Sequence, residues 1–337
     1  MIRTYLDWNA TAPLRPEARA AMIAAMDCIG NPSSVHAEGR ASKAIVERAR
    51  AQVADATGAS GADIVFTGSA TEAAALALAG QRYSSTGQEH DCVLAWTDTE
   101  PKPLGKTAQQ HANSETGIIF DIEDGTGFSD AVQVIGKVPY SFAWSGAERA
   151  IISAHKFGGP KGIGALIVRQ GIEVPPMLKG GGQEMGRRSG TENVIGIAGM
   201  GAAAEAAQRD LENGVWQKVE QNRNVLETLL LNDAPEAIIF GVDTPRLPNT
   251  SYFAVPGWKS ETQVMQMDLA GFAISAGSAC SSGKVRASKV LKAMGYDEVT
   301  ASSAIRVSIG PSTTEDEIHS FAAAWLKEYR RFKARAA

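Results

Sequence analysis

The sequence has few cysteines, little net charge and no long apolar run. Its 337 residues include only three cysteines, Cys28, Cys92 and Cys280, and none of them are spaced as CxxC. This pattern argues against a disulfide framework and against a zinc site, so we expect no metal. The formal net charge of -4 gives no electrostatic reason to expect nucleic acid or an anionic membrane as a partner.

No apolar run approaches the roughly 18 residues that a transmembrane helix needs, and the first residues lack the apolar core of a signal peptide. We therefore expect a cytoplasmic location. Apolar residues make up 44% of the chain, which is enough for a large core divided between two domains. We find no internal repeat and no low-complexity segment.

Strand-like and helix-like segments alternate over most of the chain and give way to an α+β tail. This order predicts an α/β fold, with a mostly parallel sheet, flanking helices and a smaller α+β domain. We expect a large domain over residues 12–242, and a small domain formed by residues 1–11 and 243–337. Helices are predicted at 14–26, 40–56, 73–79, 196–211 and 215–231 and from Thr314, where Glu317 completes a capping box. Strands are predicted at 63–67, 92–96, 128–133, 163–168, 237–241, 250–255, 272–275 and 305–308.

A serine, a histidine and a lysine follow the apolar run 150–152. Ser153, His155 and Lys156 precede Gly-Gly-Pro, which is typical of a buried strand that ends in a tight loop. A crowded lysine can lose its proton and attack an aldehyde, whereas a lysine in an exposed turn stays hydrated and charged. Both interpretations are open for this segment taken alone.

Two other segments suggest chemistry. The predicted strand 63–67 leads through Gly68-Ser69 into a helix that carries Thr71, and the start of such a helix favours a phosphate. Cys280 lies among small polar residues at 275–284, which predicts a thiol on a mobile loop. With Asp130 to keep a ring nitrogen protonated, these groups together suit pyridoxal phosphate, whose aldehyde Lys156 would bind as a Schiff base.

The ordered set of motifs resembles that of the cysteine desulfurases, within the NifS/IscS-like group of fold-type I pyridoxal phosphate enzymes in the class V aminotransferases. The resemblance runs from Leu6 to about Glu317. Its segments are 31–36, 66–72, 89–90, 112–117, 130–133, 153–156, 181–184, 188–193, 277–280 and 305–308.

The resemblance implies a role for each matched residue. Lys156 would be the Schiff-base lysine and proton shuttle, His90 would stack on the cofactor ring, and Cys280 would be the nucleophile that takes the sulfur. The further residues implied to bind the cofactor are Ala70, Thr71, Asp130, Gln133, Ser153, His155 and, from the other subunit of a homodimer, Thr191. The residues implied to bind the substrate are Asn31, Ser114 and Arg306.

The sequence departs from the family pattern at three places. Gly68-Ser69 stands where the family usually has Ser-Gly, and Ser114 stands where a second asparagine is common. The stretches 90–113 and 117–130 are shorter than in the family, where they hold helices and a strand. We therefore expect one face of the sheet to be bare and available to a partner or neighbouring subunit.

The resemblance implies an enzyme that converts L-cysteine to L-alanine, forms a persulfide on Cys280 and passes the sulfur to an acceptor such as an iron–sulfur cluster scaffold protein. Two alternatives stay open. One is another pyridoxal phosphate lyase that acts on a sulfur or selenium amino acid. The other is a catalytically weak or inactive scaffold or regulatory protein, which the shortened stretches and Ser114 suggest.

Overall fold

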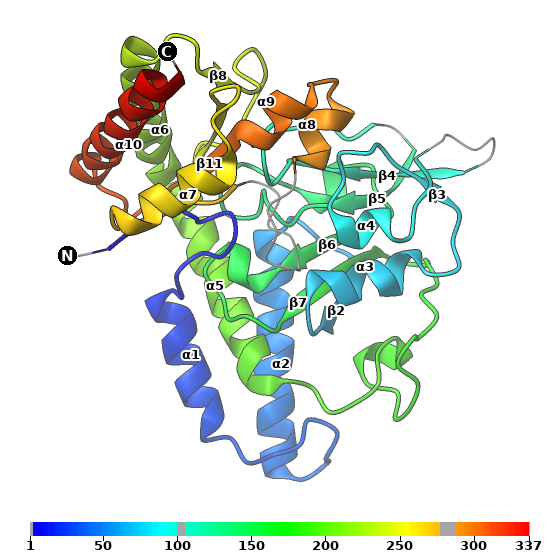
Figure 1. The fold of residues 1–337 in the computed structure, drawn as a ribbon. Coiled ribbons are helices and arrows are strands. Elements are labelled where there is room, and N and C mark those ends of the chain that lie inside the picture. The colour runs from blue at the N-terminus through cyan, green and yellow to red at the C-terminus, as the bar shows by residue number, and fades with distance from the viewer. Residues whose placement is uncertain (1–2, 100–104, 124, 277–286, 337) are drawn as a thin grey trace. The chain divides into compact units, whose positions relative to one another are not determined.

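The computed structural model describes residues 3–99, 105–123, 125–276 and 287–336. The chain forms two compact units (Figure 1). The central-sheet unit comprises Thr11–Ala112 and Phe120–Asn213, and the C-terminal unit comprises Met1–Ala10, Asn113–Ile119 and Gly214–Ala337. The domain boundaries expected from the sequence stay a prediction; in the structure, residues 113–119 and 214–242 group with the C-terminal unit.

The central-sheet unit contains a six-stranded sheet in the order β2-β7-β6-β5-β4-β3. Among the described strands of this sheet, only β7 runs antiparallel to its neighbours, so the expected mostly parallel α/β architecture is confirmed. The bounds are β2 Ala62–Thr67, β3 Tyr83–Ser84, β4 Lys106–Gln110, β5 Thr126–Asp130, β6 Arg149–Ser153 and β7 Gly164–Arg169.

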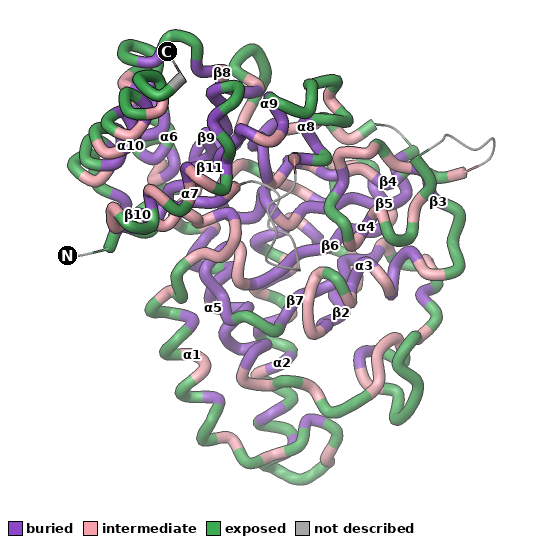
Figure 2. The backbone as a smooth tube through the Cα atoms, viewed as in Figure 1, coloured by how far each residue is buried: buried purple, intermediate pink, exposed green. Residues whose placement is uncertain are grey.

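Helices pack around this sheet. The predicted helices are confirmed as α1 Pro16–Met26, α2 Ala37–Ala56, α3 Ala70–Leu78 and α5 Val194–Glu212. Figure 1 shows α1 and α2 beside α5, where Gly201 lets α2 approach closely: an added Cβ would lie 2.6 Å from the Ala49 Cα. Helix α3 packs instead on β6 and β7, and Figure 2 shows those strands buried along most of their length.

Two expectations about the shortened region are wrong. Residues 92–96 do not form a strand, because Asp91–Leu94 form the short helix α4. The sheet is also not bare, since all five residues of β5 are buried and Phe128 shares one apolar cluster with Val93 of α4 and Ala108 of β4. Among the described strand residues of this sheet, only Lys106 and Thr107 at the start of β4 are exposed, so the chain's own segments cover the region.

The C-terminal unit contains the antiparallel sheet β11-β9-β8 and the parallel pair β1-β10. Its strands are β1 Thr4–Tyr5, β8 Ile238–Ile239, β9 Thr250–Ala254, β10 Phe272–Ala273 and β11 Ala304–Ser308, and its helices are α6 Val215–Asp233, α7 Ser260–Leu269, α8 Lys289–Ala293, α9 Glu298–Ser303 and α10 Glu315–Ala336. The predicted capping box is confirmed: the Thr314 N–H donates to Glu317 Oε2 over 2.8 Å, and the Glu317 N–H donates to Thr314 Oγ1 over 3.3 Å.

The buried core of this unit is aromatic. Trp325 of α10 packs against Phe253 of β9 and stacks on Tyr329, with ring centroids 5.6 Å apart in the second pair. None of the described helices of the chain is long and apolar enough to cross a membrane.

Candidate active site

Three strands of the central sheet end together with polar residues. Strands β2, β5 and β6 run in the same direction and end at Thr67, Asp130 and Ser153. The register places Thr67 and Ser153 on either side of Gly164, the first residue of β7. Open α/β sheets bind ligands at the carboxyl ends of their parallel strands, and Asp130 and Ser153, both predicted to bind the cofactor, lie at this edge.

The start of helix α3 lies directly against Gly164. A Cβ added at Gly164 would lie 2.7 Å from the carbonyl carbon of Ser69 and 2.8 Å from the nitrogen of Ala70, so this approach requires glycine. Ser69 is the N-cap residue, and its hydroxyl accepts from the Glu72 N–H over 3.1 Å. Ala70 and the exposed Thr71 begin the helix, whose N-terminal dipole and N–H groups favour an anion at this position.

The reversed Gly68-Ser69 pair is accommodated without strain. Ser69 is extended, with φ of -172°, and Gly68 is not left-handed, so neither residue needs the unusual turn. The Gly68 N–H donates to Glu72 Oε2 over 2.7 Å, and Arg188 Nε donates to the other carboxylate oxygen over 2.9 Å. Because Arg188 pairs with Glu72, the negative charge beside the helix start is compensated.

Lys156 follows β6 in a tight turn that other segments hold in place. The Ala12 N–H donates to the carbonyl of His155 over 2.8 Å, and the Gly159 N–H donates to the carbonyl of Ala154 over the same distance. Gly158 has a φ of +90°, which a residue with a side chain rarely adopts. These contacts fix the backbone on both sides of Lys156, and the Schiff-base role of its side chain stays a prediction.

His155 carries a buried nitrogen that needs a ligand. Its Nδ1 is buried and has no hydrogen-bond partner among the described residues. Burial and the nearby charges of Lys156, Lys161 and Lys137 lower the pKa of His155 to about 4. The ring is therefore neutral at neutral pH, and a phosphate oxygen would satisfy an Nδ1–H donor.

Asp130 is a buried carboxylate close to two of the predicted site residues. Its Oδ1 accepts from the Val132 N–H over 2.9 Å. Burial raises the pKa of Asp130, whereas this N–H and the electrostatic influence of His90 and Lys156 oppose the rise. A protonated ring nitrogen would supply the missing positive partner.

No group of three or more metal-ligating side chains occurs in the described part of the chain.

Gln133 lies one turn beyond Asp130 and is buried. Its Oε1 accepts from Lys137 Nζ over 2.7 Å. The contact with the cofactor's hydroxyl that the resemblance implies for Gln133 stays a prediction.

Cys92 is a site residue that the sequence analysis missed. His90 caps helix α4, and its Nδ1 accepts from the Cys92 N–H over 3.1 Å and lies 3.0 Å from the Cys92 thiol. Since Nδ1 is the acceptor, neutral His90 carries its proton on Nε2. The thiol also forms a hydrogen bond with Thr71, and burial raises the pKa of Cys92 to about 12. The local signal for the contact between His90 and Cys92 is a histidine that stands two residues before the cysteine, at the start of a short helix.

Glu89 is a second residue that the sequence analysis passed over. Its Oε1 accepts from the Gln110 N–H over 3.1 Å, and its buried Oε2 has no partner in the described residues. Burial, with a smaller contribution from Asp130, raises the pKa of Glu89 to about 8. We therefore expect a largely protonated carboxyl group at neutral pH, which limits the negative charge around Asp130.

The C-terminal unit brings together two of the predicted substrate-binding residues. Arg306 Nη1 donates to the carbonyl of Ser114 over 2.7 Å, and Nη2 donates to Asp7 Oδ1 over 2.8 Å. The Nε of Arg306 is buried and has no partner in the described residues. This fixed guanidinium retains a donor for a carboxylate.

Three residues predicted from the sequence lie neither at the sheet edge nor with Arg306 and Ser114 among the described contacts. Asn31 is exposed, and its side-chain oxygen accepts from the Ser33 N–H over 2.9 Å. Thr191 is exposed on the loop before α5, and Cys280 lies outside the described residues. The roles expected for Asn31, Thr191 and Cys280 stay predictions.

Comparison with known proteins agrees with this arrangement. The family model described as aminotransferase class-V matches residues 4–102 and 105–321. A cysteine desulfurase of Trichormus azollae is 39% identical over 93% of this chain and 90% of its own length, and one of Enterobacter agglomerans is 36% identical over 94% and 90%. The structure of a NifS-like protein from Rickettsia africae superposes with a TM-score of 0.88 at 29% identity, over 97% of this chain and 99% of that one.

The charges and hydrogen-bonding groups of the residues at the sheet edge fit pyridoxal phosphate. Thr71, Ser153 and His155 would bind its phosphate, Asp130 its ring nitrogen and Lys156 its aldehyde. Both the fitted site and the family match lead to the same assignment. The chain belongs to the class V aminotransferases and is a pyridoxal phosphate-dependent enzyme of the cysteine desulfurase type.

Proposed function

We propose that the enzyme converts L-cysteine to L-alanine and leaves a persulfide on Cys280. The observation that carries this proposal is the cluster at the edge of the central sheet, where Lys156 and Asp130 accompany the neutral His155 and the start of α3. Support for the substrate comes from the solved structure of SspA in complex with cysteine, which is 25% identical and superposes with a TM-score of 0.75.

The bound cofactor supplies an electron sink that stabilises negative charge at the substrate's α-carbon. Lys156 Nζ accepts the α-proton, and the buried carboxylate of Asp130 keeps the proton on the ring nitrogen. Arg306 binds the substrate's carboxylate through its guanidinium. These residues prepare the bond between the β-carbon and sulfur for cleavage.

Sulfur transfer consumes one thiol and needs no external oxidant. The Cys280 thiolate attacks the substrate sulfur, so an S–S bond forms as the C–S bond breaks. The β-carbon keeps the electron pair of the broken bond and is then protonated. Cysteine and a protein thiol thus become alanine and a protein persulfide, with all atoms accounted for.

A homodimer is part of this proposal, because the resemblance assigns Thr191 to the other subunit's site. Support comes from apolar side chains that are exposed around the end of α1 and the start of α2. Ile23 and Met26 are 55% and 58% exposed, and Ile29 and Val35 are 89% and 88% exposed. Contiguous exposed apolar residues mark interaction surfaces.

The sulfur acceptor, proposed to be an iron–sulfur cluster scaffold protein, would receive the sulfur from Cys280. A cytoplasmic location stays a prediction of the sequence.

Alanine formation from L-cysteine, followed with and without a reductant, tests the proposal. We expect Cys280→Ser to keep the absorbance of the bound cofactor and to lose alanine formation, while Cys28→Ser keeps both. Turnover retained by Cys280→Ser would remove this thiol from the mechanism. A wild-type protein that cannot bind the cofactor would instead favour the inactive scaffold, and β-elimination without persulfide would favour another lyase.

A further inference from the structure

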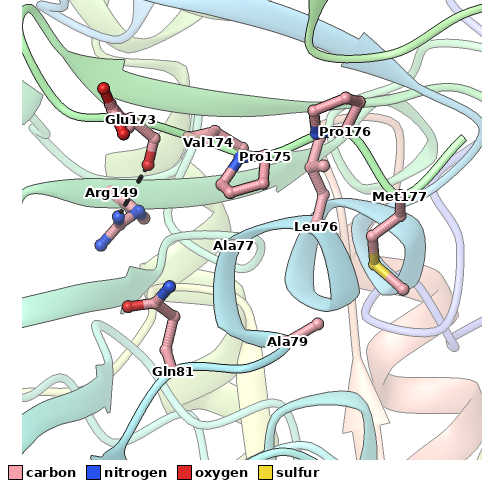
Figure 3. Close-up of a pocket in the computed structure, with 10 residues that line it drawn as sticks. All are labelled: Leu76, Ala77, Ala79, Gln81, Arg149, Glu173, Val174, Pro175, Pro176 and Met177. Carbon is pink, nitrogen blue, oxygen red and sulfur yellow. Dashed lines mark hydrogen bonds between the residues drawn. The ribbon is translucent and has the colours of Figure 1, made fainter. Parts of the chain in front are cut away.

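A cavity of about 130 Å³ lies between the end of α3 and the segment that follows β7 (Figure 3). Its walls are mostly apolar. They are formed by Leu76, Ala77, Val174, Pro175, Pro176 and Met177. Figure 3 shows Arg149 and Gln81 on one side of the cavity, and Leu76, Pro176 and Met177 on the other. The cavity therefore has one polar end, where Arg149 lies with Gln81 and Glu173, and one apolar end.

Arg149, the first residue of β6, is buried, with 6% of its surface exposed. Its Nη1 donates to the Tyr83 hydroxyl over 2.8 Å, and its Nη2 donates to the carbonyl of Glu173 over 3.3 Å. A guanidinium has five N–H donors, and the buried Nε has no partner among the described residues. Nη1 also donates to Glu148 Oε2 over 3.4 Å, so these three hydrogen bonds leave two of the five N–H donors over.

The charge of Arg149 is only partly balanced. Its nearest carboxylate is that of Glu148, 3.4 Å away, and this carboxylate is also bound by Lys106 Nζ over 2.6 Å. Glu173 is exposed, and its contact with Arg149 is made by its backbone carbonyl. A buried cation with spare donors favours an anion, and the guanidinium fork matches a carboxylate.

We propose that this cavity binds a small monocarboxylate with a branched or cyclic apolar body. The carboxylate would pair with Arg149, and the body would lie against Leu76, Val174 and Met177. An engineered apolar cavity of about 150 Å³ holds benzene, so a cavity of this size takes a body of roughly four to six carbon atoms. Gln81 and Met177 are exposed and give the ligand a way in from solvent.

The cavity is remote from the cofactor-binding residues but shares two elements with them. Helix α3 begins beside Thr71 and ends at the cavity, and β6 begins at Arg149 and ends at Ser153. At about 3.3 Å per residue, the two ends of β6 are about 13 Å apart. The cavity is thus separate from Ser153, the predicted phosphate-binding residue at the other end of β6.

The test follows the methyl signal of Met177 by NMR in the holoenzyme labelled at methionine methyl groups. The probe is 3-methylbutanoate, and its amide, 3-methylbutanamide, is the neutral control of equal size. We expect the acid to shift the Met177 signal and the amide to bind about tenfold or more weakly, because the amide loses the charge-assisted pair. Equal affinities, or no shift with the acid, would overturn the proposal.

Three variants localise the binding. Arg149→Met should weaken the acid about tenfold or more and leave the amide unchanged, whereas Arg82→Met, which removes an exposed arginine nearby, should change neither. Leu76→Phe narrows the cavity, keeps Arg149 and should abolish the shift; it serves as the test if Arg149→Met does not fold. A shift that persists in Leu76→Phe, or that equimolar sodium chloride reverses, would show that the cavity is not a carboxylate site.

Discussion

Gly164 determines how closely helix α3 approaches the edge of the central sheet. An added Cβ would lie 2.7 Å and 2.8 Å from backbone atoms of Ser69 and Ala70, and 2.9 Å from the carbonyl oxygen of Ile152. Ordinary contacts of a Cβ begin at 3.4 Å, so the nearest atom is about 0.7 Å too close (3.4 − 2.7). All three atoms are backbone and none can rotate away. Gly164→Ala should therefore displace the start of α3.

The cost of this displacement can be estimated. Overpacking a well-packed site costs about 1–3 kcal/mol, so we expect the apo-protein to lose that much free energy of unfolding. A hydrogen bond to a charged group contributes about 1.5–3 kcal/mol, and losing one such bond to the phosphate would weaken cofactor binding about tenfold or more. Gly68→Ala is the matched control, because its added Cβ meets only one side-chain atom, Glu72 Oε2 at 2.9 Å, and no backbone atom.

Cofactor affinity is measured by titrating apo-protein and following the absorbance of the bound cofactor, and stability is measured by urea unfolding. We expect Gly164→Ala to lose affinity and stability, and Gly68→Ala to lose much less of both. If the two variants bind the cofactor as tightly as the wild type, the start of α3 is not the phosphate cradle.

Three further changes test other parts of the structure. Arg50→Met should cost about 3 kcal/mol in urea unfolding, because it leaves the carboxylate of Glu184 buried without its bidentate partner; a cost below about 1 kcal/mol would contradict this. Since burial lowers the pKa of His155, the folded apo-protein binds fewer protons than the unfolded chain, so stability should fall as pH drops from 6.5 towards 4. His155→Gln should make the stability of the apo-protein depend less on pH in this range. An unchanged pH dependence would exclude His155 as its cause. Cys92, with its pKa raised to about 12, should resist iodoacetamide at pH 8 in the folded apo-protein and react after unfolding, as peptide mapping would show.

The local parts of the site could be predicted from the sequence. The turn from β2 into α3 and the turn after β6 each lie within a few residues, and their glycines, small polar residues and apolar strands are visible in the chain. The capping box at Thr314 is confirmed for the same reason. Such features depend on neighbours in sequence, so the pattern contains most of the information that determines them.

Contacts between distant segments could not be predicted in this way. The apolar run 92–96 fits a strand or a helix equally well, and the capping bond from Cys92 to His90 decides for the helix. Residues 113–119 group with the C-terminal unit because the Leu247 N–H donates to the carbonyl of Gly117 over 2.7 Å. The sheet expected to be bare is covered, because Val93 and Phe128, which lie 35 positions apart (128 − 93), belong to one buried apolar cluster.

The central claim is that Lys156 binds the cofactor at the edge of the central sheet. Borohydride reduction of the holoenzyme converts an imine between lysine and the cofactor into a stable amine, and peptide mapping by mass spectrometry locates it. We predict that the reduced cofactor is attached to Lys156, and that Lys156→Ala carries none. Attachment to another lysine of this region, such as Lys137 or Lys161, would contradict the account.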